Sequence, residues 1–204
     1  TFTGGITCES TDPAKPSIIG AVDFGATSGT PSSIGTGGIT LKQNGGIAYA
    51  GTSPGNEGGR TIYFNDYGTI IDGGEHGEFT FQSAPRTPDN NNRVRWITFR
   101  GDGLEPNTWS GSFAERWPTG EAEADHVSHR IVKDGKGTWI FTDNTGRRFG
   151  GVVEVNDGTL QFASLAEKGA VCSLGTGDYL FAKEFKSAAQ ATKVTDAFEV
   201  GGAG

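Results

Sequence analysis

The segment from Glu121 to His129 gathers more groups capable of chemistry than any other stretch of the sequence. If it forms a strand, alternate side chains share one face. That face then carries Glu121, Glu123, Asp125 and His129. Three carboxylates and an imidazole suit a divalent cation, although further ligands are needed and only His76, with glutamates nearby, offers a comparable cluster. The alternative, which the sequence favours, is a solvated edge strand whose charges discourage aggregation.

The sequence gives weaker support for other catalytic arrangements. Glycoside hydrolysis needs two carboxyl groups on either side of a sugar ring. Glu115 or Glu121 with Glu154 would serve, but 24 acidic residues leave the choice almost unconstrained. The sequence has no Gly-x-Ser-x-Gly elbow, and neither cysteine has a histidine close by. We therefore expect no catalytic residue and no cofactor, and favour a structural or recognition protein over an enzyme.

Two tryptophans are the best candidates for a binding surface. Trp109 and Trp117 lie in a polar segment, residues 102–120, punctuated by Gly and Pro. An exposed aromatic ring in such a loop suits sugar stacking or a protein interface. The tripeptide Arg100-Gly101-Asp102 spells an integrin-recognition motif on a predicted turn, but a three-letter match is common by chance. The sequence therefore predicts contacts through Trp109 and Trp117.

The two cysteines, Cys8 and Cys172, lie near opposite ends of the chain. In an oxidising compartment they could form a disulfide that closes a long loop. In the chain-entropy model such a disulfide would stabilise the fold by about 4–5 kcal/mol. The alternative is two unrelated buried thiols. In either case both cysteines are expected to be structural.

Composition excludes several classes of protein. Hydrophobic residues make up 34% and aromatic residues 10% of the 204 residues, which is too apolar for a disordered chain. The net charge of −7 repels phosphate backbones, so nucleic acid is not expected as a partner. No run approaches 18 consecutive apolar residues, so no membrane insertion is expected.

A short repeat points to the architecture that must position these groups. Thr3-Gly4-Gly5-Ile6-Thr7 returns as residues 36–40, 33 positions later, and residues 44–48 resemble it again. A second resemblance, between residues 20–24 and 60–64, has an offset of 40. Paired glycines before a β-branched residue suit a chain that turns sharply and then enters a strand. The repeat therefore indicates stacked β units.

The remaining strands are separated by strong turn signals. Apolar runs at 130–133, 138–142, 151–155 and 159–162 are separated by Asp-Gly, Asp-Asn-Thr-Gly and Asn-Asp-Gly. Asp-Gly between such runs is a strong hairpin signal, so an antiparallel meander is predicted here. The fold class expected is all-β: an antiparallel β-sandwich, barrel or fibre-like stack with short Gly-rich N-terminal strands. Two parts are expected, a Gly/Ser/Thr-rich N-terminal arm at 1–59 and an antiparallel domain at 60–204.

The repeated Thr-Gly-Gly-Ile-Thr, the small-residue turns and the more aromatic C-terminal half resemble bacteriophage tail-fibre or related virion appendage proteins. This resemblance implies a self-associating, trimeric β shaft or tip at the virion surface or outside the cell. It also implies a partner, a bacterial surface glycan or protein, that is bound without catalysis.

Two alternatives remain open. One is a secreted β-barrel of the lipocalin or allene-oxide-cyclase kind that holds an apolar small molecule. The other is an extracellular filament subunit that assembles by strand addition.

Overall fold

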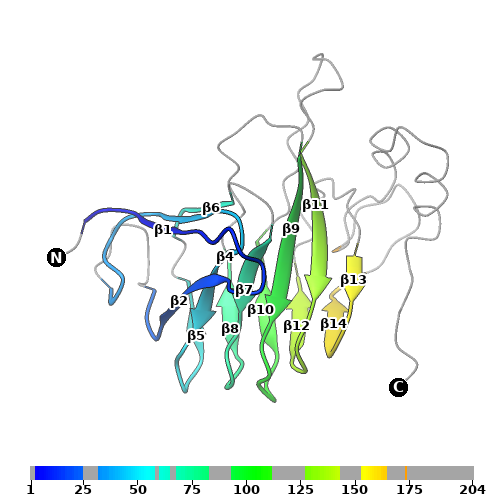
Figure 1. Cartoon of the computed structure of the whole chain (residues 1–204). Coiled ribbons are helices and arrows are strands. Elements are labelled where there is room, and N and C mark those ends of the chain that lie inside the picture. The colour runs from blue at the N-terminus through cyan, green and yellow to red at the C-terminus, as the bar shows by residue number, and fades with distance from the viewer. Residues whose placement is uncertain are drawn as a thin grey trace, which may run out of the picture.

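The protein is a stack of short β-strands. A computed structural model describes residues 3–24, 32–57, 60–64, 68–82, 93–111, 127–142, 153–164 and 173, and the fold is built from these. Fourteen strands are present in the described part of the chain, and it contains no helix (Figure 1). The prediction of an all-β protein is therefore confirmed for these residues.

The strands form three sheets. The first, sheet A, contains β1 (Ile6–Cys8), β3 (Ile39–Leu41) and β6 (Ile62–Phe64). Sheet B contains, in spatial order, β13 (Val153–Val155), β11 (Val127–Lys133), β9 (Arg93–Arg100), β7 (Thr69–Asp72), β4 (Gly45–Tyr49) and β2 (Ser17–Ala21). Sheet C contains β14 (Thr159–Phe162), β12 (Thr138–Phe141), β10 (Asn107–Trp109), β8 (Phe79–Phe81) and β5 (Gly55–Asn56).

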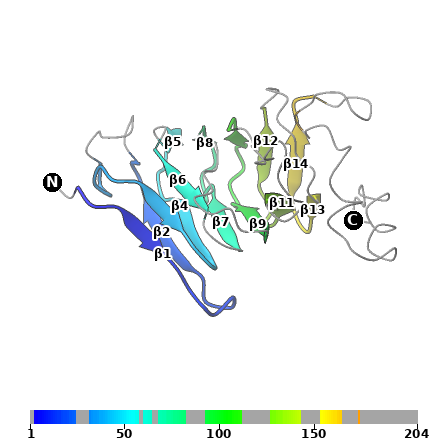
Figure 2. The same cartoon turned by 90° about the horizontal axis from the view of Figure 1, so that it is seen from above.

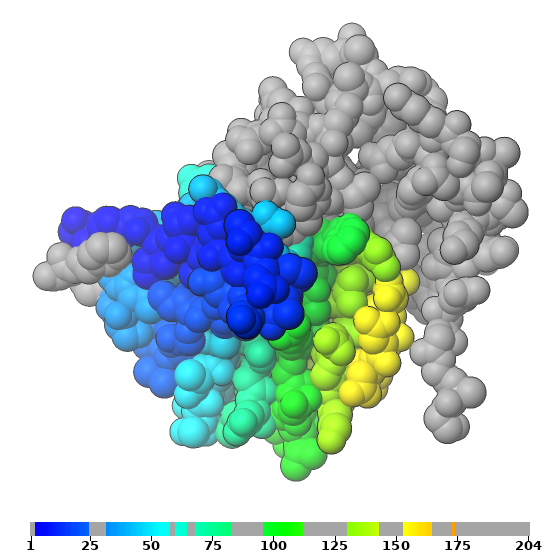
Figure 3. Space-filling view, viewed as in Figure 1, coloured from blue at the N-terminus to red at the C-terminus, as the bar shows by residue number. Residues whose placement is uncertain are grey.

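Every strand pair is parallel, and the chain visits the sheets in turn. Paired residues lie from 21 positions apart, as in Thr138 with Thr159, to 34 apart, as in Arg93 with Val127. Each step of this size is one coil, which adds one strand to each sheet that it visits. Figure 2 shows sheets B and C side by side, and Figure 3 shows successive coils as bands from blue to yellow. The fold is a parallel β-solenoid.

The predicted antiparallel pairing is therefore wrong, and so are the sandwich and the barrel. The turn at Asp134-Gly135 joins β11 of sheet B to β12 of sheet C, and β11 and β12 do not pair with each other. Asn156-Asp157-Gly158 joins β13 to β14 in the same way. A glycine with positive φ can reverse a hairpin or turn the corner of a coil, so the local signal does not distinguish them.

The first sequence repeat is a true structural repeat. Ile6 pairs with Ile39 and Thr7 with Thr40, so the two Thr-Gly-Gly-Ile-Thr segments lie on neighbouring coils of sheet A. The prediction of stacked β units is confirmed. The third copy, at residues 44–48, lies instead in β4 of sheet B. The 40-residue offset also fails, because residues 20–24 belong to the coil of β2, whereas 60–64 lead into β6 of sheet A.

Apolar side chains fill the interior between the three sheets. In β3, β6, β8, β10 and β12 alternate residues are buried, which places ladders of like side chains inside the stack. One ladder in sheet C runs through Phe81, Trp109, Phe141 and Phe162. The Phe81 and Trp109 rings stack with centroids 4.4 Å apart, and Phe99 of sheet B meets Trp109 edge-on at 5.1 Å. These aromatic contacts hold sheets B and C together.

A buried arginine fixes the first coils. Arg60 is almost fully buried, and its guanidinium donates to Gly37 O at 2.7 Å, Ser32 Oγ at 2.7 Å, and the carbonyls of Phe24 and Gly35. Burial lowers the pKa of Arg60, and the Asp23 carboxylate partly offsets this effect. Arg60 thereby satisfies three backbone carbonyls and one hydroxyl of the segment between β2 and β3.

The two predicted parts share one stack. The strand pairs β3–β6, β4–β7 and β5–β8 each join a strand before residue 60 to one after it, and one core runs through both. Cys8 is a buried free thiol in β1, and burial raises its pKa. Its predicted disulfide partner, Cys172, lies outside the described residues. Ser173 hydrogen-bonds to Ser164, just after β14, at the opposite end of the stack from Cys8.

Candidate functional site

The corner where sheet B passes to sheet C carries a series of charged residues. In sheet B, β7 and β9 end in Asp72 and Arg100, and Asp134 and Asn156 directly follow β11 and β13; a glycine comes within two residues of each. Gly74, Gly135 and Gly158 have φ of 75°, 74° and 69°, which only glycine adopts without strain. The sequence therefore places a polar turn at the same point of successive coils.

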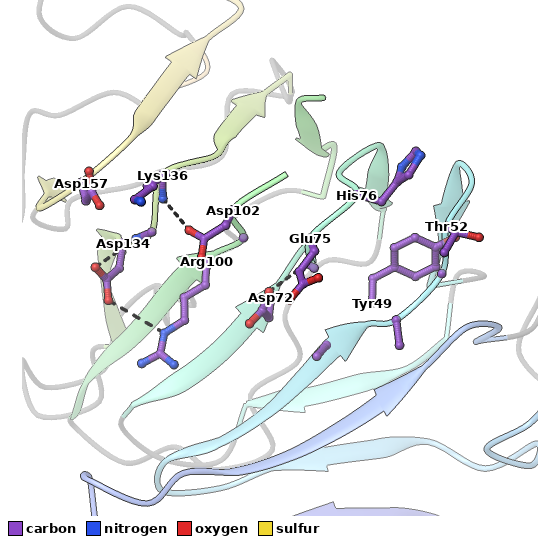
Figure 4. A pocket seen from close by; sticks show the side chains of 16 residues that line it. Tyr49, Thr52, Asp72, Glu75, His76, Arg100, Asp102, Asp134, Lys136 and Asp157 are labelled. Carbon is purple, nitrogen blue, oxygen red and sulfur yellow. Dashed lines mark hydrogen bonds and ion pairs between the residues drawn. The ribbon is translucent and has the colours of Figure 1, made fainter. Parts of the chain in front are cut away.

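These turns line a groove of about 1100 Å³ (Figure 4). The groove begins at Tyr49, the last residue of β4, and Thr52, and it ends at Asp157 after β13. It thus crosses five coils, or about 19 Å at the usual strand separation of 4.8 Å. Its lining holds five carboxylates and two permanent cations: Asp72, Glu75, Asp102, Asp134, Asp157, Arg100 and Lys136.

Most of these carboxylates also hold the corner in shape. Asp72 accepts from Gly74 N at 2.8 Å, Asp102 from Lys136 N at 2.8 Å, and Asp157 from Gly158 N at 2.8 Å. Each bond uses one carboxylate oxygen. In the described part of the chain, the second oxygen of these three aspartates makes no hydrogen bond. The backbone therefore fixes acceptor groups whose remaining oxygen can bind a donor from a ligand.

The cations are interleaved with the carboxylates. Arg100 pairs in register with Asp72 on one side, and its Nε lies 3.9 Å from Asp134 Oδ2 on the other. Opposite charges on neighbouring strands attract, so this row is stabilised across three coils. Arg100 and Lys136 supply donors to a groove that is otherwise rich in acceptors.

A buried lysine supports the corner from inside. Lys133 occupies a core position of β11, in the ladder that contains Phe99, and is fully buried. Its Nζ donates to Asp134 O at 2.8 Å, Gly135 O at 2.6 Å and Asp157 O at 3.2 Å. Burial lowers the pKa of Lys133, while nearby carboxylates, Asp157 first, oppose the shift. The ammonium thus holds the turns of two successive coils together.

Trp109 is not at the surface. Its ring is fully buried between Phe81 and Phe99, so it cannot be the exposed contact predicted from the sequence. Trp117 lies outside the described residues. The polar composition of residues 102–120 suggested a loop, but β10 brings Trp109 into the core.

The predicted metal ligands are not tested as a group. Glu121, Glu123 and Asp125 lie outside the described residues, and His129 lies in β11. Among the residues that the structure describes, no group of three His, Cys, Asp or Glu could hold a metal ion. His76 Nδ1 lies 3.8 Å from Glu78 Oε2, and the His76 side chain lines the groove.

The Arg100-Gly101-Asp102 tripeptide begins with the last residue of β9 and continues into the corner that follows it. It does not project freely, because Asp102 N donates to Gly74 O at 3.1 Å and Gly137 N donates to Gly101 O at 2.8 Å. Its two charged side chains line the groove. The sequence contained the signal for this site, since each Asp-Gly turn follows a strand of sheet B, but only the coil register brings the turns together.

Comparisons with known proteins do not assign the chain to a family. No family model, no curated protein and no solved structure matches the chain. The fold alone defines the class of the protein, a parallel β-solenoid with a charged corner groove. No helix in the described ranges is long and apolar enough to cross a membrane.

Proposed function

We propose that the protein is a recognition module that binds an extended surface glycan along the corner groove, as part of an extracellular or virion appendage. The observation that carries the proposal is the groove itself, which presents fixed polar groups from five successive coils. A solenoid offers such an elongated surface because every coil repeats the same corner. A polymer with repeated hydroxyl groups fits this arrangement.

The lining favours a glycan over a protein partner. The cores of protein interfaces are depleted of Asp, Glu and Lys, whereas these residues, with Arg100, dominate the groove. Sugar hydroxyls both donate and accept hydrogen bonds, so they can use the aspartate oxygens and the Arg100 and Lys136 donors together. The excess of carboxylates disfavours an anionic polymer, so the ligand is a neutral or amino-bearing glycan.

The chain is also proposed to self-associate, as the resemblance to appendage proteins implies. An extracellular filament subunit that assembles by strand addition is the second candidate function. It is favoured by β14, which among the described strands pairs on one side only, with β12, and whose Leu160 and Phe162 are only half-buried.

The glycan proposal is tested by binding to linear oligosaccharides of three kinds: neutral, amino-bearing and uronate-containing. We expect binding to the first two and weaker binding to the third, measured by calorimetry. Asp102→Asn and Asp157→Asn keep the acceptor that holds each turn but remove the charge, and should each weaken binding about 10-fold or more.

Asp12→Asn is a matched control. Asp12 Oδ1 also accepts a hydrogen bond from a backbone N–H, that of Ala14 at 2.9 Å, and Asp12 is exposed and does not line the groove. Its substitution should leave affinity unchanged. If no oligosaccharide binds, or if Asp12→Asn weakens binding as much as Asp102→Asn does, the groove is not a glycan site.

A further inference from the structure

An exposed tryptophan lies on the same face as the groove residues of sheet B. Ile97 and Phe99 of β9 point into the core and are fully buried, so Trp96, Thr98 and Arg100 point outward. Trp96 remains 46% exposed. Arg100 lines the groove four residues further along the strand, which corresponds to about 13 Å. An exposed indole and the groove therefore share one surface.

The Trp96 ring is supported on one side. Trp96 pairs in register with Arg130 of β11, and the Arg130 guanidinium carbon lies 5.1 Å from the centre of the ring. Arg130 in turn forms an ion pair with Glu154 of β13. Three coils thus fix the indole by a cation–π contact and a salt bridge, so little conformational freedom remains to be lost when a ligand binds.

Arg130 does not cover the whole ring. With the Arg130 guanidinium in contact, 46% of Trp96 remains exposed. A ligand can therefore reach the part of the indole that Arg130 leaves uncovered.

From these observations, and resting on the proposed function, we propose that Trp96 is a second glycan subsite, where a sugar ring stacks on the exposed part of the indole. The apolar face of a sugar ring matches an aromatic plane, while its hydroxyl groups remain in water. The ligand that reaches both Trp96 and Arg100 is an oligosaccharide rather than a single sugar, because the two lie about 13 Å apart.

The test measures how Trp96→Ala and Trp96→Phe bind the oligosaccharide that the wild-type protein binds. The oligosaccharide is used in two lengths, one that reaches only the groove and one that reaches both the groove and Trp96. Trp96→Ala should weaken binding of the long chain at least about fivefold, and Trp96→Phe should largely retain it. Leu104→Ala, at an apolar side chain that is 98% exposed and outside the groove lining, is the control and should change nothing. Wild-type indole fluorescence should respond to the ligand, and the response should be smaller in Trp96→Phe.

The outcomes separate the two proposals. If Asp102→Asn weakens binding and Trp96→Ala does not, the groove is correct and the Trp96 subsite is overturned. If Trp96→Ala instead lowers the native mass measured by light scattering and leaves glycan affinity unchanged, this face is a protein interface and the subsite is overturned. If neither set of variants affects any glycan, the proposed function itself fails.

Discussion

Two tryptophans in this chain have opposite environments, and residue-level physics separates their roles. Trp109 is fully enclosed by aromatic neighbours, whereas Trp96 is nearly half exposed. Removing a buried Trp side chain costs about 3–5 kcal/mol through lost burial and the cavity left behind. We expect Trp109→Ala to lower the free energy of unfolding by that amount and Trp96→Ala by less than about 1 kcal/mol. Chemical denaturation of both variants measures this, and equal losses would contradict the assignment of Trp96 to the surface.

Lys133 gives the stability a defined dependence on pH. Burial lowers the pKa of its ammonium in the folded protein, while an unfolded lysine titrates near 10.4. Between these two values the unfolded chain binds more protons than the folded chain, so the free energy of unfolding rises with pH. Below the folded pKa this contribution does not change with pH.

The comparison that isolates this effect is wild type against Lys133→Met, since all other titrating groups are shared. We expect the free energy of unfolding of the wild type to increase relative to the variant as pH is raised from 7 toward 10. Denaturant titrations at several pH values measure the difference. A difference that is constant or falls over this range would show that the ammonium is not held in a desolvated site.

At the scale of the elements, the corner turns require glycine for two separable reasons. Gly74 and Gly135 have nearly the same φ, 75° and 74°. A Cβ at Gly74 would lie 2.2 Å from Tyr49 O, whereas at Gly135 the nearest atom is 3.1 Å away. Alanine at either position incurs the cost of a left-handed conformation, about 1–2 kcal/mol.

Gly74→Ala therefore adds a backbone clash to this conformational cost, and Gly135→Ala adds at most a small adjustment. We expect Gly74→Ala to lower the melting temperature clearly more than Gly135→Ala does, as measured by circular dichroism. Equal shifts would mean that conformation alone sets the requirement and that the close approach of neighbouring coils relaxes without cost.

The strands and turns were readable from the sequence, but their partners were not. Alternation of apolar residues predicted strands near 130–133, 138–142 and 159–162, and all three exist. Alternation and an Asp-Gly turn look the same in a hairpin and at a solenoid corner, because both depend on local dihedral angles. Pairing in this fold joins residues 21–34 positions apart, and only the exact repeat at Ile6 and Ile39 revealed such a spacing.

The same limit applied to the candidate site. Each charged turn was visible alone, yet the groove exists only because the coil register places Asp72, Arg100 and Asp134 side by side. Trp109 was misjudged because its polar neighbours in sequence suggested a loop, while its burial depends on Phe81 and Phe99 from other coils. Local composition does not report contacts of that range.

At the scale of the whole molecule, each coil covers the core of the next, so the terminal coils protect the interior. The first coil supplies β1 and β2, which pair with β3 and β4. Ile39, Leu41 and Ile47 are fully buried beneath it. In a solenoid, a coil without its neighbour exposes apolar side chains and unpaired strand edges together.

Deleting residues 1–38 should therefore uncover the second coil. We expect the truncated chain to lose stability and to associate more strongly than the full chain, because its exposed edges and apolar ladder can pair with another copy. Light scattering gives the mass and denaturation gives the stability. Deletion of residues 1–4 alone, which leaves β1 intact, is the control and should match the full chain. If the larger deletion left both the mass and the stability unchanged, the first coil would not cover the core, and neighbouring coils would be less dependent on one another than their shared ladders indicate.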